Sequence, residues 1–190
     1  MFAYCLNNPT CGADSNGTRM VSNVNIEDGS GSRKVIKYEI DCFHQGQTSL
    51  CWAYCMVMRH IYDSGETISE DEAFIRAKKL GELYHPILGW NTGLPFFLQG
   101  KKAKIASVND LYNLLVDYGP VYAAYKIPWS FTGHIVLVTG VDVTMDKVYT
   151  NNPWGVPGEQ SYSEFLDDFV PGNYQYDPRF ELYAIYIPTF

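Results

Sequence analysis

The sequence predicts an α+β fold, in which a helical layer packs on a mainly antiparallel sheet. Two observations support this prediction. Three helical patterns come first along the chain, and the part after residue 120 is rich in β-branched and aromatic residues in strand-like runs. Helices and strands that are segregated in this way favour one helical layer and one sheet over alternating βαβ units.

The helices are predicted from apolar spacing and from capping residues. Residues 50–62 are almost wholly apolar, which predicts a buried central helix that ends at Gly65. A second helix begins after Ser69, which we expect to form a capping box with Glu72. A third amphipathic helix runs from about residue 108 to 118.

The strands are predicted from alternating and β-branched runs. One strand precedes the helices, at residues 35–40, and the others follow them, at 121–127, 135–143, 148–150 and 182–187. Residues 84–106 are punctuated by Gly and Pro, so we expect a long connection there.

Composition limits the classes of function. The chain has 190 residues, of which 46% are hydrophobic and 15% aromatic, and its net charge is −7. An acidic protein without a long basic cluster is a poor ligand for nucleic acid, so we expect no nucleic-acid partner. No run of about 18 apolar residues is present, so we expect no membrane span. The first residues lack a basic start and an apolar segment, and we expect no signal peptide.

The five cysteines are too few and odd in number for a disulfide framework, so at least one thiol is free. Cys51 lies where a loop enters the buried helix, and a helix N-terminus favours a thiolate. His134, at the start of an apolar strand, is the candidate base. Asn151 or Asn152 follows the next strand and can orient the imidazole. Cys55, one helical turn after Cys51, is assigned to the core.

A zinc site and a different histidine base are the alternatives for these residues. Cys51 with Cys55 or His44 could be a fragment of a zinc site, but no second ligand pair has metal-like spacing. We therefore expect no metal and no cofactor. His60 lies half a helical turn away from Cys51, which excludes it as the base. His44 precedes Gln45 and is interpreted as a bystander that could at most contact substrate, and His85 has no evident partner.

The chemical residues together resemble a known family. Gln45, Cys51-Trp52-Ala53, the Gly-His pair at His134 and the segment Asn152-Pro153-Trp154-Gly155 follow the motif order of papain-like cysteine peptidases. The resemblance covers about residues 38–190 and implies a papain-like fold, with the catalytic cysteine on the buried central helix.

The resemblance implies a role for each matched residue. Cys51 is the nucleophile, His134 its acid–base partner, and Asn152 orients the imidazole. Gln45 and the Cys51 backbone N–H form the oxyanion hole, and Trp154 shields the bond between His134 and Asn152. We expect the cysteine and histidine to rest as a thiolate–imidazolium pair.

The sequence also departs from the larger members of that family. His134 follows Cys51 by only 83 residues, against about 130–150 in papain itself. This resembles the compact bacterial members. Thr48 stands where secreted members have a disulfide cysteine, as expected of an enzyme acting where thiols stay reduced.

The N-terminus resembles a second family. The end of the Rhs (YD-repeat) core contains a similar order of residues, and this sequence matches it at Tyr4, Asn7, Asn8, Pro9, Asp14 and Gly17, with Ser15 in place of a proline. The resemblance implies that residues 1–37 are an Rhs-core remnant and linker, and that residues 38–190 are a toxin domain released from a delivery shell.

The two resemblances imply a cysteine protease that acts as an interbacterial toxin. It would be secreted within a larger toxin and would cleave a cytosolic protein of the target bacterium. A cognate immunity protein would cover its active-site cleft. The alternatives are a protein deamidase or acyl transferase with the same triad, or a papain-like shell used only for binding.

Overall fold

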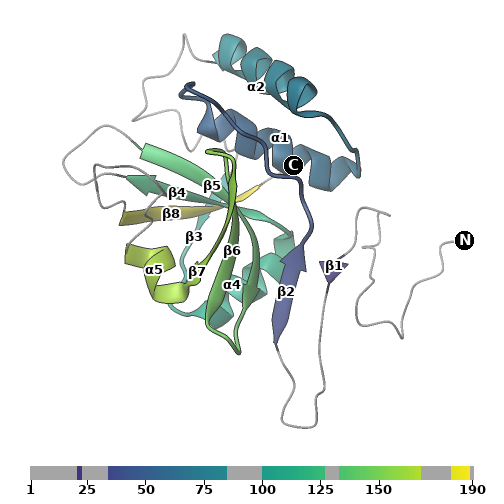
Figure 1. Ribbon diagram of the computed structural model, residues 1–190. Coiled ribbons are helices and arrows are strands. Elements are labelled where there is room, and N and C mark those ends of the chain that lie inside the picture. The colour runs from purple at the N-terminus through teal and green to yellow at the C-terminus, as the bar shows by residue number, and fades with distance from the viewer. Residues whose placement is uncertain (1–20, 23–33, 85–99, 127–132, 168–180, 189–190) are drawn as a thin grey trace, which may run out of the picture.

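The computed structural model describes residues 21–22, 34–84, 100–126, 133–167 and 181–188 (Figure 1). The helices among these residues are α1 (Cys51–Ser64), α2 (Glu70–Tyr84), α4 (Val108–Tyr118) and α5 (Tyr162–Asp167). The strands are β1 (Val21–Ser22), β2 (Val35–Tyr38), β3 (Gly100–Ala103), β4 (Val121–Lys126), β5 (Gly133–Asp142), β6 (Lys147–Asn152), β7 (Val156–Ser161) and β8 (Glu181–Pro188). This mixture of helices and antiparallel strands confirms the predicted α+β class.

Strand β5 is the centre of the sheet. The strands follow the order β1-β2-β5-β4-β8-β3, and β6 joins β5 and carries β7 on its far side. The first part of β5 pairs with β4, its last part pairs with β2, and residues 137–142 pair with β6. All of these pairings are antiparallel. A strand with partners on both edges is held in a fixed register, and this fixes the positions of the side chains on its first residues.

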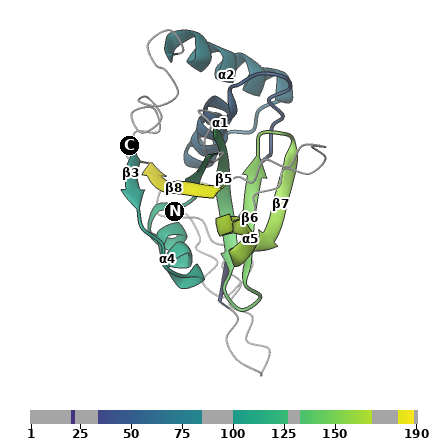
Figure 2. The ribbon, with the colours of Figure 1, turned by 90° about the vertical axis from the view of Figure 1, so that its left-hand side faces the viewer.

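The sheet is covered on both faces. Figures 1 and 2 show α1 and α2 together at one end of the sheet and α4 apart from them. Alternate residues of β5 divide between two cores, because successive side chains of a strand point to opposite faces. Ile135 and Leu137 join the core beneath α1, and Val136 and Val138 join the core beneath α4. This explains why β5 is a continuous apolar run.

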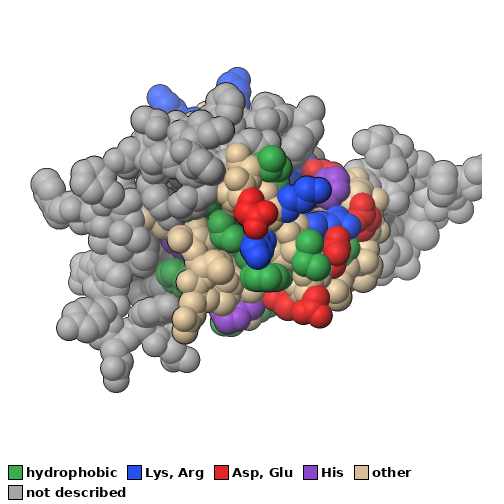
Figure 3. Space-filling model, turned by 90° about the horizontal axis from the view of Figure 1, so that it is seen from above, with side chains coloured by type: hydrophobic (Ala, Val, Ile, Leu, Met, Phe, Trp, Pro, Cys, Tyr) green, Lys and Arg blue, Asp and Glu red, His purple; other side chains and the backbone are tan. Residues whose placement is uncertain are grey.

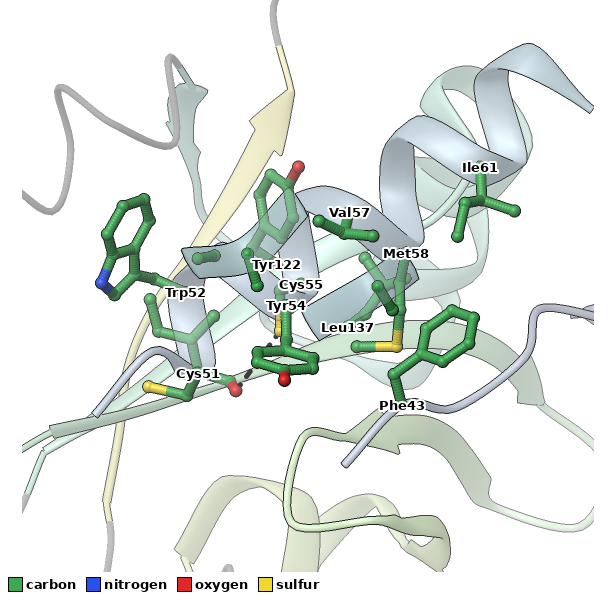
Figure 4. Close-up of a cluster of buried hydrophobic side chains, with 14 of the residues drawn as sticks. Phe43, Cys51, Trp52, Tyr54, Cys55, Val57, Met58, Ile61, Tyr122 and Leu137 are labelled. Atoms are coloured by element: carbon green, nitrogen blue, oxygen red, sulfur yellow. Dashed lines mark hydrogen bonds between the residues drawn. The ribbon is translucent and has the colours of Figure 1, made fainter. Parts of the chain in front are cut away.

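Helix α1 is buried because both of its long sides are apolar. Ten of its residues are buried, and they include Cys55, Met58 and Ile61. Figure 4 shows Cys55, Val57 and Met58 among the side chains of the core. The helix ends at Gly65, which adopts the left-handed conformation (φ 69°) and donates its N–H to the carbonyl of Ile61. The predicted buried helix and its terminating glycine are therefore present.

The long connection predicted over residues 84–106 is wrong in part. Residues 100–103 form β3, an edge strand that pairs with β8. The strand carries Lys101 and Lys102, and lysine has a low β propensity. Lysines are common on edge strands, where they prevent the strand from pairing with a further strand. The sheet partner therefore overrides the local sequence.

The capping boxes also differ from the prediction. Ser69 accepts the N–H of Glu72 at 3.2 Å, but the Glu72 carboxylate accepts Nε of Arg76 instead of closing the box. A full capping box starts α5, where Ser161 and Glu164 each accept the backbone N–H of the other. The sequence Ser-x-x-Glu at 161–164 carries this signal for a helix start.

The predicted N-terminal segment, residues 1–37, lies outside the described residues except for 21–22 and 34–37. Cys5, Cys11 and His85 lie outside them as well. Within the described ranges, no helix is both long and apolar enough to cross a bilayer.

The close pairing of β2 with β5 depends on a glycine. A Cβ atom added at Gly140 would lie 2.5 Å from the backbone oxygen of Ile36. We expect Gly140→Ala to lower the free energy of unfolding by about 1–3 kcal/mol or more, because the obstacle is backbone and cannot rotate away. Urea unfolding measures the change.

A matched substitution separates this clash from the general effect of alanine. In Gly81→Ala the added Cβ meets only the tip of the Leu50 side chain, at 2.8 Å. That tip can move, and alanine favours helix over glycine by up to about 1 kcal/mol. We expect Gly81→Ala to cost less than Gly140→Ala. Equal losses in the two variants would contradict the crowding of β2 against β5.

Candidate active site

Cys51 is the first residue of α1 and is 2% exposed. The residue before it, Leu50, occupies the N-cap position without a side-chain hydrogen bond, and the first turn has no acidic residue. The backbone N–H groups of this turn therefore have no side-chain cap. Figure 4 shows the Cys51 sulfur pointing away from the labelled core side chains, at the edge of the cluster. The thiol lies at a helix end that can stabilise negative charge.

His134 and Asn152 meet because their strands are paired. His134 is the second residue of β5, Asn152 is the last residue of β6, and the pairing sets Leu137 opposite Asn151. Nε2 of His134 lies 2.8 Å from Oδ1 of Asn152, and both side chains are buried. An amide oxygen can only accept, so Nε2 carries the proton and Nδ1 is the acceptor nitrogen of the ring.

Trp154 covers this hydrogen bond. Its ring stacks on the His134 ring with centroids 3.8 Å apart and planes 15° apart. Its backbone N–H also donates to Oδ1 of Asn152 at 3.1 Å. The chain can turn here because Gly155 has a φ of 89°, a value that favours glycine. The asparagine oxygen thus accepts two hydrogen bonds beneath an aromatic ring.

The two asparagines have different partners. Asn152 contacts His134, whereas Nδ2 of Asn151 donates to the carbonyl of Ile40 at 2.7 Å. Successive side chains of a strand point in opposite directions, so only one of the pair can face the histidine.

The Cys51 thiol lies beside the first residues of β5. The backbone of Ile135, the residue next to His134, is near enough to lower the pKa of this thiol. One turn further along α1, the Cys55 thiol donates to the Ile135 carbonyl at 3.4 Å. The first turn of α1 is therefore joined to the strand that carries His134. Cys55 is fully buried, in agreement with its assignment to the core.

Gln45 is held in a closed loop before α1. Its Nε2 donates to the Thr48 carbonyl at 2.5 Å, and the Thr48 hydroxyl donates back to the Gln45 carbonyl at 2.7 Å. The side chain is 6% exposed. An amide nitrogen carries two N–H groups, so one can still be donated to a substrate. Gly46, with a φ of 62°, lets the loop turn back.

Burial controls the protonation of the cysteine and the histidine. Removal from water raises the pKa of the Cys51 thiol to about 11, although hydrogen bonds from the backbone of Ile135, Trp52 and Cys51 itself act the other way. Burial lowers the pKa of His134 to about 4, against the effect of the Asn152 hydrogen bond, which raises it. Burial therefore favours the neutral form of each group, against the hydrogen bonds that favour the charged forms. The thiolate–imidazolium pair expected from the sequence stays a prediction.

The remaining histidines lie elsewhere. The exposed side chain of His60 is 3.9 Å from Glu66, at the far end of α1 from Cys51. His44 is exposed, and its backbone forms a β-bridge with Trp154. Among the described residues, no three His, Cys, Asp or Glu side chains are grouped as metal ligands would be.

Comparison with known proteins gives one family. The family model described as papain-like cysteine protease AvrRpt2 matches residues 32–171, well over half of the 190 residues. The matched range contains Gln45, Cys51, His134 and Asn152. A search of curated proteins found no match.

The burial of neutral His134 has a consequence for stability. Its pKa is about 4 in the folded protein, against 6.5 ordinarily, so the unfolded chain binds more protons between these values. We expect the free energy of unfolding to be unaffected by this group above pH 6.5 and to fall by about 3 kcal/mol as the pH drops to 4. Chemical denaturation at a series of pH values measures this slope.

Two variants test the assignment of that slope. His134→Gln removes the titrating group and should flatten the profile between pH 6.5 and 4. His60→Gln removes an exposed histidine of α1 and should retain the slope. If His134→Gln kept the full slope, another group would be responsible for it.

Proposed function

The chain belongs to the papain-like cysteine protease family AvrRpt2, and from this premise we propose that it is a thiol hydrolase that cleaves peptide bonds. The observation that carries the proposal is the contact between His134 Nε2 and Asn152 Oδ1 beneath Trp154. With Nε2 as the donor to Asn152, Nδ1 of His134 is the nitrogen to which we assign the proton of Cys51.

We propose that the reaction begins from the neutral pair. Nδ1 of His134 accepts the thiol proton of Cys51 while the sulfur attacks the carbonyl carbon of the scissile bond. A carbon–sulfur bond forms, and the carbonyl electron pair moves to its oxygen. The Cys51 backbone N–H and the second Nε2 proton of Gln45 donate to this oxyanion.

The imidazolium then acts as an acid. His134 gives its Nδ1 proton to the leaving nitrogen, the carbon–nitrogen bond breaks, and an amine leaves. The acyl group remains on Cys51 as a thioester. A water molecule, deprotonated by Nδ1, attacks the thioester and releases a carboxylic acid and the thiol. In each half of the cycle His134 is charged only between taking up the proton and giving it away, in agreement with its buried surroundings.

The Asn152 hydrogen bond has two effects in this mechanism. It fixes the plane of the imidazole through Nε2, which the proposed transfer to Nδ1 requires, and it favours the protonated ring, since it raises the pKa of His134. Trp154 keeps water from the bond, which strengthens it in a low dielectric. Together these effects offset part of the cost of charging a buried imidazole.

We propose that the substrate is a cytosolic protein of a target bacterium and that the enzyme is the toxin domain of an Rhs-type protein. The proposal is supported by the resemblance of residues 2–17 to the end of an Rhs core. A cognate immunity protein would then protect the producing cell by covering the cleft around Cys51 and Trp154.

The described surface of α1 and α2 favours a protein as the partner. Seen from above, basic and acidic side chains are interspersed there (Figure 3). Arg76, for example, pairs with both Glu66 and Glu72. Such a face offers no extended positive surface for a phosphate backbone.

Loss of the nucleophile tests the proposal. We expect Cys51→Ala to abolish growth inhibition in bacteria that express the chain, and to abolish the new protein N-termini that proteomics detects with the wild type. The substitution removes one sulfur atom from a helix end, so the protein should stay folded. His60→Ala, on the same helix, is the control and should remain active.

The intact mass of an affected target protein identifies the bond that is broken. Fragments support peptide cleavage. An unfragmented target that gains about one mass unit would replace the protease with a deamidase that uses the same residues. Undiminished growth inhibition by Cys51→Ala would overturn the catalytic proposal altogether.

A further inference from the structure

A seam of hydrogen bonds joins the chain before α1 to the end of β6. We define the seam as residues 40–45 and 151–154, which lie side by side. Nδ2 of Asn151 donates to the Ile40 carbonyl at 2.7 Å, and the Cys42 thiol donates to the Asn152 carbonyl at 3.2 Å. The Gln45 N–H donates to the Pro153 carbonyl at 2.6 Å. The bridge between His44 and Trp154 completes the seam.

We infer that Cys42 is a positioning residue, whose thiol holds the backbone of Asn152 so that its side chain meets His134. The inference rests on the proposed function, since it assigns to Asn152 the orientation of the catalytic imidazole. It gives a second cysteine of this chain a role distinct from nucleophilic attack.

The surroundings of Cys42 suit a donor and not a nucleophile. Its side chain is half-buried, and burial raises the pKa of the thiol to about 11 despite the hydrogen bond to Asn152. The carboxylate of Glu70 acts in the same direction. The thiol therefore keeps its proton at neutral pH and can donate it continuously.

The bond matters because Asn152 is fixed at both of its oxygens. Its carbonyl accepts the Cys42 thiol and, at 2.9 Å, the Gly155 N–H. Its side-chain oxygen contacts His134 and accepts the Trp154 N–H. The turn 152–155 provides the Gly155 and Trp154 donors, so it moves together with Asn152. The Cys42 thiol comes from another part of the chain, and it fixes that turn relative to the loop that carries Gln45.

The seam thus connects two parts of the site that lie far apart in the sequence. Gln45 belongs to the loop that leads into α1, and Asn152 belongs to the sheet. Their relative position decides whether the oxyanion donor and the imidazole address the same carbonyl. A misplacement of about 1 Å in such a pair lowers the rate up to about a hundredfold.

A substitution series at Cys42 tests the inference. Cys42→Ala removes the donor, and Cys42→Ser retains one. We expect Cys42→Ala to lower kcat about tenfold with KM unchanged within about twofold, because substrate contacts remain and only the catalytic geometry is loosened. Cys42→Ser should restore kcat to within about threefold. Glu39→Ala, an exposed residue beside the seam, is the control.

A spectroscopic measurement reads the geometry without any substrate. In nitrogen-15 NMR of the imidazole, the Nε2–H resonance of His134 reports its hydrogen bond to Asn152. We expect this resonance to weaken through faster exchange in Cys42→Ala and to persist in Cys42→Ser. Asn151→Ala removes another donor of the seam and should act in the same direction, which covers the case in which Cys42→Ala does not fold.

The outcomes separate the inference from the proposed function. If the wild type cleaves no protein but the resonance follows the Cys42 donor, the positioning role stands and the proposed function fails. If Cys42→Ala keeps both kcat and the resonance, the inference is overturned. A Cys42→Ser variant as impaired as Cys42→Ala would likewise overturn it, because packing and not hydrogen bonding would then be responsible.

Discussion

The exclusion of water from the start of β5 is the constraint on which the proposed site depends. Because the sheet is covered on both faces, the first residues of β5 are buried between two cores, and His134 is 2% exposed. A buried imidazole resists protonation, so the site needs partners that stabilise it when it is charged. In the proposed function Asn152 and Trp154 are those partners, and the pairing of β6 with β5 places the asparagine beside the histidine.

The same burial changes the expected chemistry of the thiol. A helix N-terminus favours a thiolate, but the burial of Cys51 raises the pKa of its thiol to about 11 against the backbone hydrogen bonds that lower it. In the proposed function the pair starts neutral, and the proton moves from Cys51 to His134 when the substrate is attacked. The three described cysteines then have different roles. In the proposed function Cys51 reacts, while Cys55 and Cys42 donate to the backbone carbonyls of Ile135 and Asn152.

The sequence could predict those parts of the fold and site that local patterns encode. The apolar run over residues 50–62 predicts α1. The motif order of Cys51, His134 and Asn152 predicts which residues belong to the candidate site. Strand β3 could not be predicted, because a lysine-rich edge strand is created by its partner β8 and not by its own residues. The burial-driven pKa shifts of Cys51 and His134 and the Cys42 hydrogen bond could not be predicted either, since they depend on burial and on contacts between distant segments, which no local pattern contains.

The rate at which Cys51 reacts with iodoacetamide tests the central claim, that His134 is the base for this thiol. Peptide mass analysis after partial labelling gives the rate at each cysteine, with no need for a substrate. At pH 7 we expect Cys51 to be alkylated about a hundredfold faster in the wild type than in His134→Ala, while the slow labelling of Cys42 is the same in both. Equal rates at Cys51 in the two proteins, or a wild type labelled only at Cys42, would contradict the claim.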